Sequence, residues 1–199
     1  MTRLALLSAL ALSVAMPAFA QRAGAPLPTK DDPGIQIVYA TNAAQQCFNA
    51  AQNGAQLKFG LDHCNVAVVD PLTIYRAQTF VNRGIIRYDM GDRKGALNDF
   101  DIALDYNPSL GDAYLNQALV LVAEKRPQDA MAAISKGIAL GATNLQVAYY
   151  SRGEIEDDAG HFAQAYRDYR QALMIKPDYA PAQRQLERFK VVPRSTQTR

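Results

Sequence analysis

Apolar residues recur with helical spacing along most of the chain, from about Ile35 onward. A period of three to four residues places apolar side chains on one face of a helix. The strict alternation that marks a solvent-facing strand is missing from this part of the sequence. The pattern therefore predicts an all-α fold, with residues 1–34 and 191–199 outside it.

The helical pattern repeats at a nearly constant interval. Phe80, Tyr114 and Tyr149 are separated by 34 and then by 35 residues. Six further columns keep the same two steps, and they are Gly84–Ala118–Gly153, Gly91–Lys125–Gly160, Ala96–Ala130–Ala165, Phe100–Ile134–Tyr169, Ala103–Gly137–Ala172 and Pro108–Ala142–Pro177. One extra residue in the loop at 141–144 explains the longer second step. Columns that stay in register over three copies indicate a repeat architecture.

The spacing has a physical cause in a pair of antiparallel helices. Small residues such as Gly84 and Ala96 are predicted where the two helices cross, because they let the backbones approach. Gly91 and Gly160 are predicted in the turns, where a positive φ is needed. Pro108 ends the second helix. One hairpin cannot cover its own apolar face, so the hairpins must stack.

These columns resemble those of the tetratricopeptide repeat family, whose order is aromatic, small, Gly, Ala, aromatic, Ala and Pro. The first copy reads FVNRGIIRYDMGDRKGALNDFDIALDYNP and the third reads YYSRGEIEDDAGHFAQAYRDYRQALMIKP. The middle copy departs from the family, with Lys125 at the turn glycine and Ala142 at the proline. The resemblance implies three repeats, at residues 77–110, 111–145 and 146–179, in a right-handed superhelical stack of helix hairpins.

The flanking regions are predicted to complete the stack. Residues 35–76 fit a degenerate N-terminal hairpin with helices at about Ala43–Gln52 and Ala55–Val69. Residues 180–190 are amphipathic, as expected of the C-terminal capping helix that a repeat stack needs. Residues 191–199 are predicted to be a disordered tail. A cysteine followed by LDHCNVA and FVNRGI resembles exported alpha-proteobacterial tetratricopeptide repeat proteins.

The N-terminus is predicted to be a secretory signal peptide. A basic start at Arg3 precedes 13 uncharged residues, Leu4–Met16, and an A-x-A cleavage pattern that ends at Ala20. The apolar run is too short for a membrane anchor, which needs about 20 residues. Cleavage of residues 1–20 leaves an exported chain with a Pro-rich arm at residues 21–34 and no membrane insertion. We expect this chain in the periplasm.

The two cysteines are predicted to pair. Export places Cys47 and Cys64 in an oxidising compartment, where an even cysteine count favours a disulfide. Asn53 and Gly54 lie near the midpoint between them, and a helical hairpin with its turn there brings the thiols face to face. Two buried free thiols are the alternative.

Composition excludes several function classes. The 21 Lys and Arg against 19 Asp and Glu give a net charge of +2, so no basic excess favours nucleic acid. Two Cys and two His are too few for multi-ligand zinc or iron–sulfur sites. The sequence also lacks a phosphate-binding loop and a GxGxxG motif. We therefore predict no cofactor.

Candidate catalytic and calcium-binding sets are weak. His63 precedes Cys64, but consecutive helical residues do not face each other, so we favour a surface histidine beside a disulfide cysteine. Four acidic residues lie close together on one predicted helix, at Glu154, Glu156, Asp157 and Asp158. A helix spreads such side chains around its circumference, which favours a solvated face over a calcium site. The sequence predicts a non-enzymatic protein.

The resemblance also implies a binding face. In tetratricopeptide repeats, the first helix of each hairpin lines a concave groove that usually binds peptides. The family register places nine residues of this chain there, which we call the groove residues: Val81, Asn82, Ile85, Tyr88, Leu115, Asn116, Leu119, Tyr150 and Glu154. Family members that clamp a C-terminal carboxylate use Lys and Arg at such positions, and this chain lacks them.

Two repeated columns carry polar side chains. Asn82 and Asn116 share one column. Either their side-chain amides bind the backbone of an extended peptide, or they make only contacts within the hairpins. Arg83 and Arg152 share another, and we expect them to pair with a nearby carboxylate rather than with a ligand.

The sequence therefore predicts an exported adaptor of the bacterial cell envelope that binds a segment of another protein in its groove. The alternative is a homo-oligomeric structural protein whose groove is filled by the arm at residues 21–34, from its own or a neighbouring chain.

Overall fold

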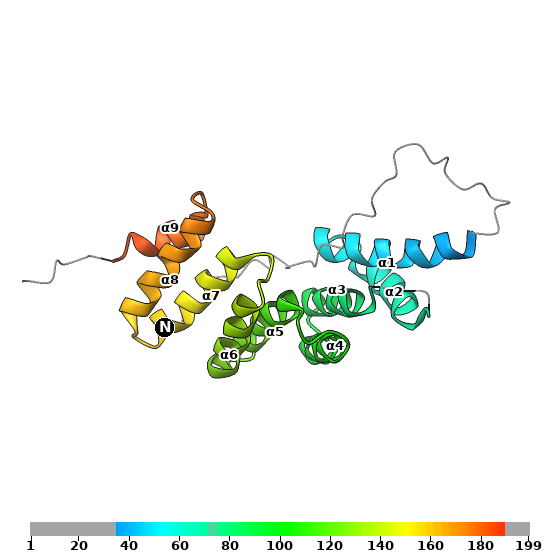
Figure 1. Ribbon diagram of the computed structural model, residues 1–199, viewed down its shortest axis with the longest axis horizontal. Helices are drawn as coiled ribbons and strands as arrows, with labels where there is room; N and C mark the ends of the chain where they lie inside the picture. Colours follow the sequence, from blue (N-terminus) through cyan, green and yellow to red (C-terminus); the bar gives the residue numbers. More distant parts are fainter. Residues whose placement is uncertain (1–34, 72, 74, 190–199) are drawn as a thin grey trace, which may run out of the picture. The chain divides into compact units, whose positions relative to one another are not determined.

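The computed structural model describes residues 35–71, 73 and 75–189. Every regular element among them is an α-helix (Figure 1), which confirms the all-α fold class. No helix in this part of the chain is long and apolar enough to cross a membrane. The predicted signal peptide, the arm at residues 21–34 and the tail at residues 191–199 lie outside the described residues.

The helices of the described residues are α1 (Ile35–Asn53), α2 (Leu57–Val69), α3 (Arg76–Asp89), α4 (Arg93–Tyr106), α5 (Gly111–Ala123), α6 (Pro127–Ala139), α7 (Leu145–Asp158), α8 (Phe162–Ile175) and α9 (Ala180–Leu186). The chain divides into two compact units. The first unit ends at Thr143 and contains α1–α6, and the second begins at Asn144 and contains α7–α9.

Consecutive helices pack as hairpins within each unit. In the first unit the hairpins are α1–α2, α3–α4 and α5–α6, and the first helix of each contacts the first helix of the next. In the second unit α7 and α8 form a hairpin, and α9 packs against α8. The stacking of hairpins that the repeat pattern predicts is thus present within the first unit.

The close approach of paired helices explains the column of small residues. A Cβ atom added to Gly84 of α3 would lie 2.5 Å from Cε1 of the buried Phe100 in α4. A Cβ atom added to Gly153 of α7 would lie 2.8 Å from Cε1 of the buried Tyr169 in α8. In both hairpins an aromatic ring of the second helix rests on the backbone of the first, so a side chain there would displace the ring.

The turns between paired helices keep one geometry despite a change of residue. Gly91 and Gly160 have φ values of 86° and 78°, as predicted, and Lys125 has a φ of 59° at the same column. The amide N–H of Lys125 donates to Val122 O at 3.0 Å, which matches the bond from Gly91 to Tyr88 O at 2.9 Å. The middle repeat therefore keeps the left-handed helix end although it lacks the glycine that adopts it most easily.

A disulfide joins the two helices of the N-terminal hairpin. Cys47 of α1 and Cys64 of α2 are bonded and fully buried, which confirms the predicted pairing and removes the free-thiol alternative. Gly54 and Gln56 are left-handed in the turn, with φ values of 61° and 52°. α2 consequently begins at Leu57, slightly later than predicted, and α1 begins upstream of its predicted start.

The C-terminal helix ends earlier than position 190, where the sequence analysis placed it. After Leu186, the amide N–H of Arg188 donates to Gln185 O and that of Phe189 donates to Leu186 O, both at 3.1 Å. Such bonds across three residues tighten the chain into a final turn and end the α-helix. This turn carries the side chain of Arg188 to Asp157 of α7, at 2.8 Å.

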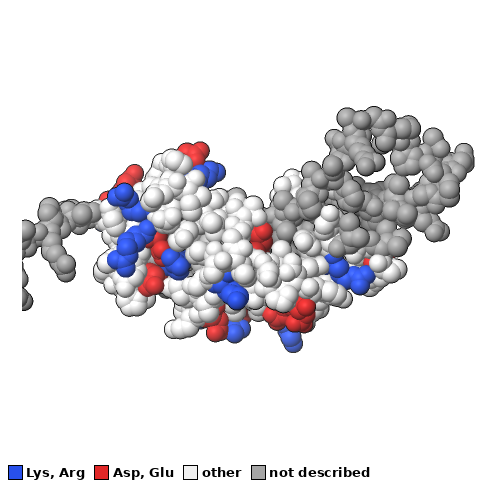
Figure 2. Space-filling model, in the orientation of Figure 1, with Lys and Arg blue, Asp and Glu red and all other residues white. Residues whose placement is uncertain are grey.

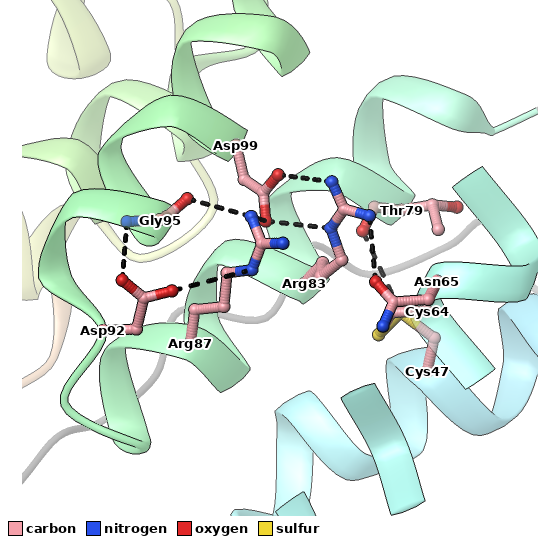
Figure 3. Close-up of polar contacts among 9 residues, drawn as sticks. All are labelled: Cys47, Cys64, Asn65, Thr79, Arg83, Arg87, Asp92, Gly95 and Asp99. Atoms are coloured by element: carbon pink, nitrogen blue, oxygen red, sulfur yellow. Dashed lines mark hydrogen bonds and ion pairs between the residues drawn. A yellow bond between two sulfur atoms is a disulfide. The ribbon is translucent and has the colours of Figure 1, made fainter. Parts of the chain in front are cut away.

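A buried carboxylate ties α3 to α4 (Figure 3). Asp99 of α4 is fully buried and accepts hydrogen bonds from Arg83 at 2.7 and 3.0 Å and from Arg87 at 2.9 Å. Arg83 also donates to Oδ1 of Asn65 in α2, at 3.0 Å. The arginine column thus pairs with a carboxylate, as predicted, and in the first repeat it also reaches the disulfide-bonded hairpin.

The same pairing recurs in the second unit but is absent from the middle repeat. Arg152 of α7 donates to both oxygens of Asp168 in α8, at 2.7 and 2.8 Å. The middle repeat has Gln117 and Ala133 in these columns, and Gln117 donates instead to Asp101 at 2.7 Å. Ion pairing between the helices therefore belongs to the first and third repeats.

The change Gly84→Ala tests the packing of α3 on α4. Glycine to alanine within a helix normally gains roughly 0.5–1 kcal/mol of stability. Here the added methyl group would displace the ring of Phe100, so we expect a loss of about 1–3 kcal/mol in the free energy of unfolding.

The matched control for this change is Asn98→Ala, at an exposed position of α4. It should alter the free energy of unfolding by less than about 0.5 kcal/mol. Chemical denaturation measures both variants, and equal stability of the two would contradict the predicted packing.

Candidate binding site on the first helices of the repeats

The nine groove residues lie on the first helices of three hairpins. Seven are on α3 and α5 in the first unit, and the other two, Tyr150 and Glu154, are on α7 in the second. Six of the nine are buried, and they are Val81, Asn82, Ile85, Leu115, Asn116 and Tyr150. The other three, Tyr88, Leu119 and Glu154, are partly exposed. Sequence spacing does not reveal this burial, which in the first unit follows from α1 packing on α3 and α3 on α5.

The second helices carry much of the charged surface of the first unit. Figure 2 shows Lys, Arg, Asp and Glu side chains gathered along the lower edge of this unit, over α4 and α6. Exposed charged residues on these two helices include Asp101, Asp105, Asp129 and Lys136. The groove residues on α3 and α5 have no charged member, so the two sets differ in chemistry as well as in position.

Asn82 lies on α3 with its whole side chain buried. Neither its amide nitrogen nor its amide oxygen has a hydrogen-bond partner among the described residues. Leaving a buried polar group unpaired costs about 1–3 kcal/mol, so most native structures avoid it. Asn82 is therefore a buried amide whose donor and acceptor are both unused by the described residues.

Asn116 occupies the same column in α5 but is used by the fold. Its amide donates to the backbone oxygen of Asp112 at 2.8 Å. The carboxylate of Asp112 in turn accepts from the backbone and the hydroxyl of Thr143, at 2.8 and 2.7 Å. The amide of Asn116 thus makes a hydrogen bond within its own helix, while the amide of Asn82 makes none among the described residues.

The groove residues of the second unit meet tyrosines from α8 and from the turn before α9. The hydroxyl of Tyr150 donates to Oε1 of Glu154 at 2.7 Å. The ring of Tyr150 lies 5.8 Å from that of Tyr169 and 5.6 Å from that of Tyr179, measured between centroids. Tyr169 is fully buried, and its hydroxyl has no partner among the described residues.

The surroundings of Glu154 disfavour its charged form. Burial raises the pKa of Glu154, and the nearby charges of Asp157 and Asp158 act in the same direction. The hydrogen bond from Tyr150 acts in the opposite direction and only partly offsets burial. Burial also raises the pKa of Tyr150, Tyr169 and Tyr179 above their usual range, so these phenols keep their protons at neutral pH.

The other acidic residues of α7 point to separate partners. Oε2 of Glu156 lies 2.7 Å from Nδ1 of His161, and Asp157 binds Arg188. Asp158 is exposed. The four carboxylates that the sequence groups together are therefore distributed over different contacts, and Glu154 differs from the others in being held by a tyrosine.

His63 and Cys64, the weak catalytic candidates on α2, both make contacts of a structural kind. Cys64 is in the disulfide and has no thiol. The ring of His63 packs edge-on against Phe59, with centroids 4.3 Å apart. These contacts fit the histidine beside a disulfide that the sequence favours.

The third repeat matches a known sequence family. Residues 147–179 match the family model described as "Tetratricopeptide repeat". These residues span the Arg152–Asp168 pair and the crossing at Gly153, whose counterparts lie two repeats upstream in the first repeat. The match therefore identifies a tetratricopeptide repeat at residues 147–179. No curated protein sequence matches this chain.

Solved structures resemble this chain in fold. The first tetratricopeptide repeat domain of Spaghetti (RPAP3), bound to the HSP90 peptide SRMEEVD, is 21% identical with a TM-score of 0.53, over 56% of this chain and 87% of that chain. MamA from Desulfovibrio magneticus RS-1 is 19% identical with a TM-score of 0.61, over 75% and 80%. A chain of the APC/C hetero-tetramer Cut9–Hcn1 is 17% identical with a TM-score of 0.65, over 75% and 29%.

The raised pKa of Glu154 predicts how its replacement changes stability with pH. The folded chain holds the Glu154 proton more tightly than the unfolded chain, so the ionised carboxylate lowers stability above the raised pKa and this penalty fades as pH falls. We expect Glu154→Gln to have a higher Tm than the unsubstituted protein at pH 7. The difference should shrink toward the ordinary glutamate pKa of about 4.3.

The control for this prediction is Glu187→Gln, which removes the same charge from an exposed position of the second unit whose charge does not act on Glu154. Thermal denaturation of the three proteins between neutral and acidic pH measures the effect. A lower Tm for Glu154→Gln at pH 7 would show that the ionised carboxylate stabilises the fold, contrary to this account.

Proposed function

We propose that this protein is a non-enzymatic interaction scaffold that binds an extended segment of another protein along its groove residues. The observation that carries the proposal is the buried, unpaired amide of Asn82 on α3. A peptide backbone offers one N–H and one C=O at almost every residue, so it can satisfy both atoms of that amide. Because Asn82 is covered in the structure, binding must displace the atoms that cover it.

The solved structures support the same class of function. The RPAP3 domain is bound to a peptide, and Cut9–Hcn1 is a complex of two different proteins. The groove residues of this chain include no Lys or Arg that could clamp a C-terminal carboxylate. We therefore expect the ligand to be an internal segment of its protein, contacted by the apolar and amide side chains of α3 and α5.

The proposed place of action is the periplasm of a bacterial cell envelope, reached after cleavage of residues 1–20. The basic start, the apolar run and the A-x-A pattern support this proposal. The disulfide between Cys47 and Cys64 is consistent with an oxidising compartment. The balanced charge supports a protein partner over nucleic acid.

Substitution of the partly exposed groove residues tests the binding face. Replacing Tyr88 and Leu119 together, by Ala and Ser, removes apolar contact area without opening the buried core. Loss of one well-placed contact typically costs about 2 kcal/mol of binding free energy. We therefore expect that this double variant no longer captures the partner from periplasmic extract.

The matched control replaces Asp105 and Lys136 by Ala, at exposed positions of α4 and α6. This variant should recover the partner in full. Recovery of the same partner by both variants at unchanged Tm would place binding elsewhere. Capture of the chain itself, with a doubled mass in light scattering, would favour the homo-oligomeric alternative.

The mass of the protein purified from the periplasm tests the export proposal. We expect a chain that begins at Gln21 and gains no alkyl groups unless it is first reduced, because both cysteines are in the disulfide. Intact mass spectrometry with and without reduction measures both the N-terminal residue and the oxidation state of the cysteines. A retained N-terminus in the cell-associated protein would contradict export by signal cleavage.

A further inference from the structure

We propose that the second unit binds a basic side chain, lysine or arginine, of the partner protein, through the carboxylate of Glu154 and the tyrosines Tyr150, Tyr169 and Tyr179 around it. We call these four residues the tyrosine–carboxylate site. The inference rests on the proposed function, because it takes the ligand to be a segment of another protein.

The carboxylate of Glu154 lacks a paired cation among the described residues. Two arginines of this unit are engaged elsewhere, since Arg152 binds Asp168 and Arg188 binds Asp157, and the charge of Arg184 acts on Tyr179, where it lowers the pKa. Among the described residues, Glu154 has a hydrogen bond from Tyr150 and no ion pair. A partly buried carboxylate that lacks a positive partner attracts a cation more strongly than a fully exposed one does.

The hydroxyl of Tyr169 is a second, independent sign of a missing group. It is buried and unpartnered among the described residues, and it lies close enough to Glu154, Asp157 and Arg188 for their charges to act on it. Glu154 likewise has a second oxygen, Oε2, for which the described residues supply no donor. An ammonium or guanidinium group has only donors, so it matches these oxygen acceptors.

The aromatic rings add a further attraction for a cation. Tyr150 and Tyr179 meet almost at right angles, with an interplanar angle of 84° and centroids 5.6 Å apart. A cation within about 6 Å of a ring face is attracted by the ring electrons. The unit already uses this contact elsewhere, because the guanidinium of Arg152 lies 5.2 Å from the ring centre of Tyr149.

The chain itself shows that a guanidinium fits this acidic surface. Arg188 donates to Asp157 at 2.8 Å and also to Gln185. Its side chain is 60% exposed while that of Asp157 is 10% exposed, so the cation approaches the buried carboxylate from solvent. Glu154 lies one turn before Asp157 on α7, and a partner's side chain would approach it in the same manner.

Titration with single amino-acid derivatives tests this site directly. The probes are Nα-acetyl-lysine amide, Nα-acetyl-arginine amide and the uncharged Nα-acetyl-norleucine amide, added to the whole protein with isotope-labelled tyrosine. We expect saturable shifts of the Tyr150 and Tyr179 ring signals with the two basic probes only. Glu154→Gln keeps an oxygen acceptor for Tyr150 but removes the charge, so it should weaken binding at least about tenfold.

The matched control is Glu187→Gln, which should change the affinity by less than about twofold because Glu187 is exposed and its charge does not act on Glu154. Equal shifts with norleucine, no saturable shift with the basic probes, or unchanged binding in Glu154→Gln would each overturn the inference. If the titration fails but the Tyr88 and Leu119 variant no longer captures the partner, the proposed function is still supported and only this inference is wrong. Binding of the basic probes with no partner loss in that variant supports this inference and overturns the proposed binding face.

Discussion

The pairing of a buried carboxylate with an arginine sixteen residues before it sets how the first helix of a repeat is turned against the second. Asp99 is fully buried, and a buried charge that lost its partner would cost several kcal/mol. α3 must therefore present Arg83 to α4, and its opposite side carries the groove residues. Arg152 and Asp168 impose the same orientation on α7, where that side carries Glu154. The middle repeat lacks the pair, and its hairpin is instead closed by Asp112, which holds the loop at Thr143.

Much of the fold could be predicted from the sequence because its repeats encode contacts that are local in the chain. The small residue at Gly84 and the ring of Phe100 belong to one hairpin, and so do the cysteines at Cys47 and Cys64. The middle repeat is instructive, since Lys125 adopts the left-handed turn conformation that the other repeats give to glycine. The hydrogen bonds at the helix end fix that conformation, and residue type alone does not reveal it.

The candidate site was harder to predict because it depends on contacts between hairpins. The family register groups Val81 and Asn82 with the groove residues, but both are buried once neighbouring helices stack on α3. In the second unit, the helical pattern predicts that the acidic residues of α7 form one solvated face. The structure separates them, because Arg188 comes from 31 residues downstream to pair with Asp157, while Glu154 accepts a hydrogen bond from Tyr150, whose ring packs against those of Tyr169 and Tyr179. A carboxylate set among tyrosines is chemically distinct from the same residue in water.

The central claim is that partners bind on the first helices of the repeats. Site-specific photo-crosslinking in the living cell tests it most directly, with the photoreactive residue placed at the partly exposed position of Leu119 on α5 or at the exposed position of Lys136 on α6. The account predicts a covalent adduct with another protein from position 119 and none from position 136. Adducts from position 136 alone, or adducts only with a second copy of the chain, would contradict it.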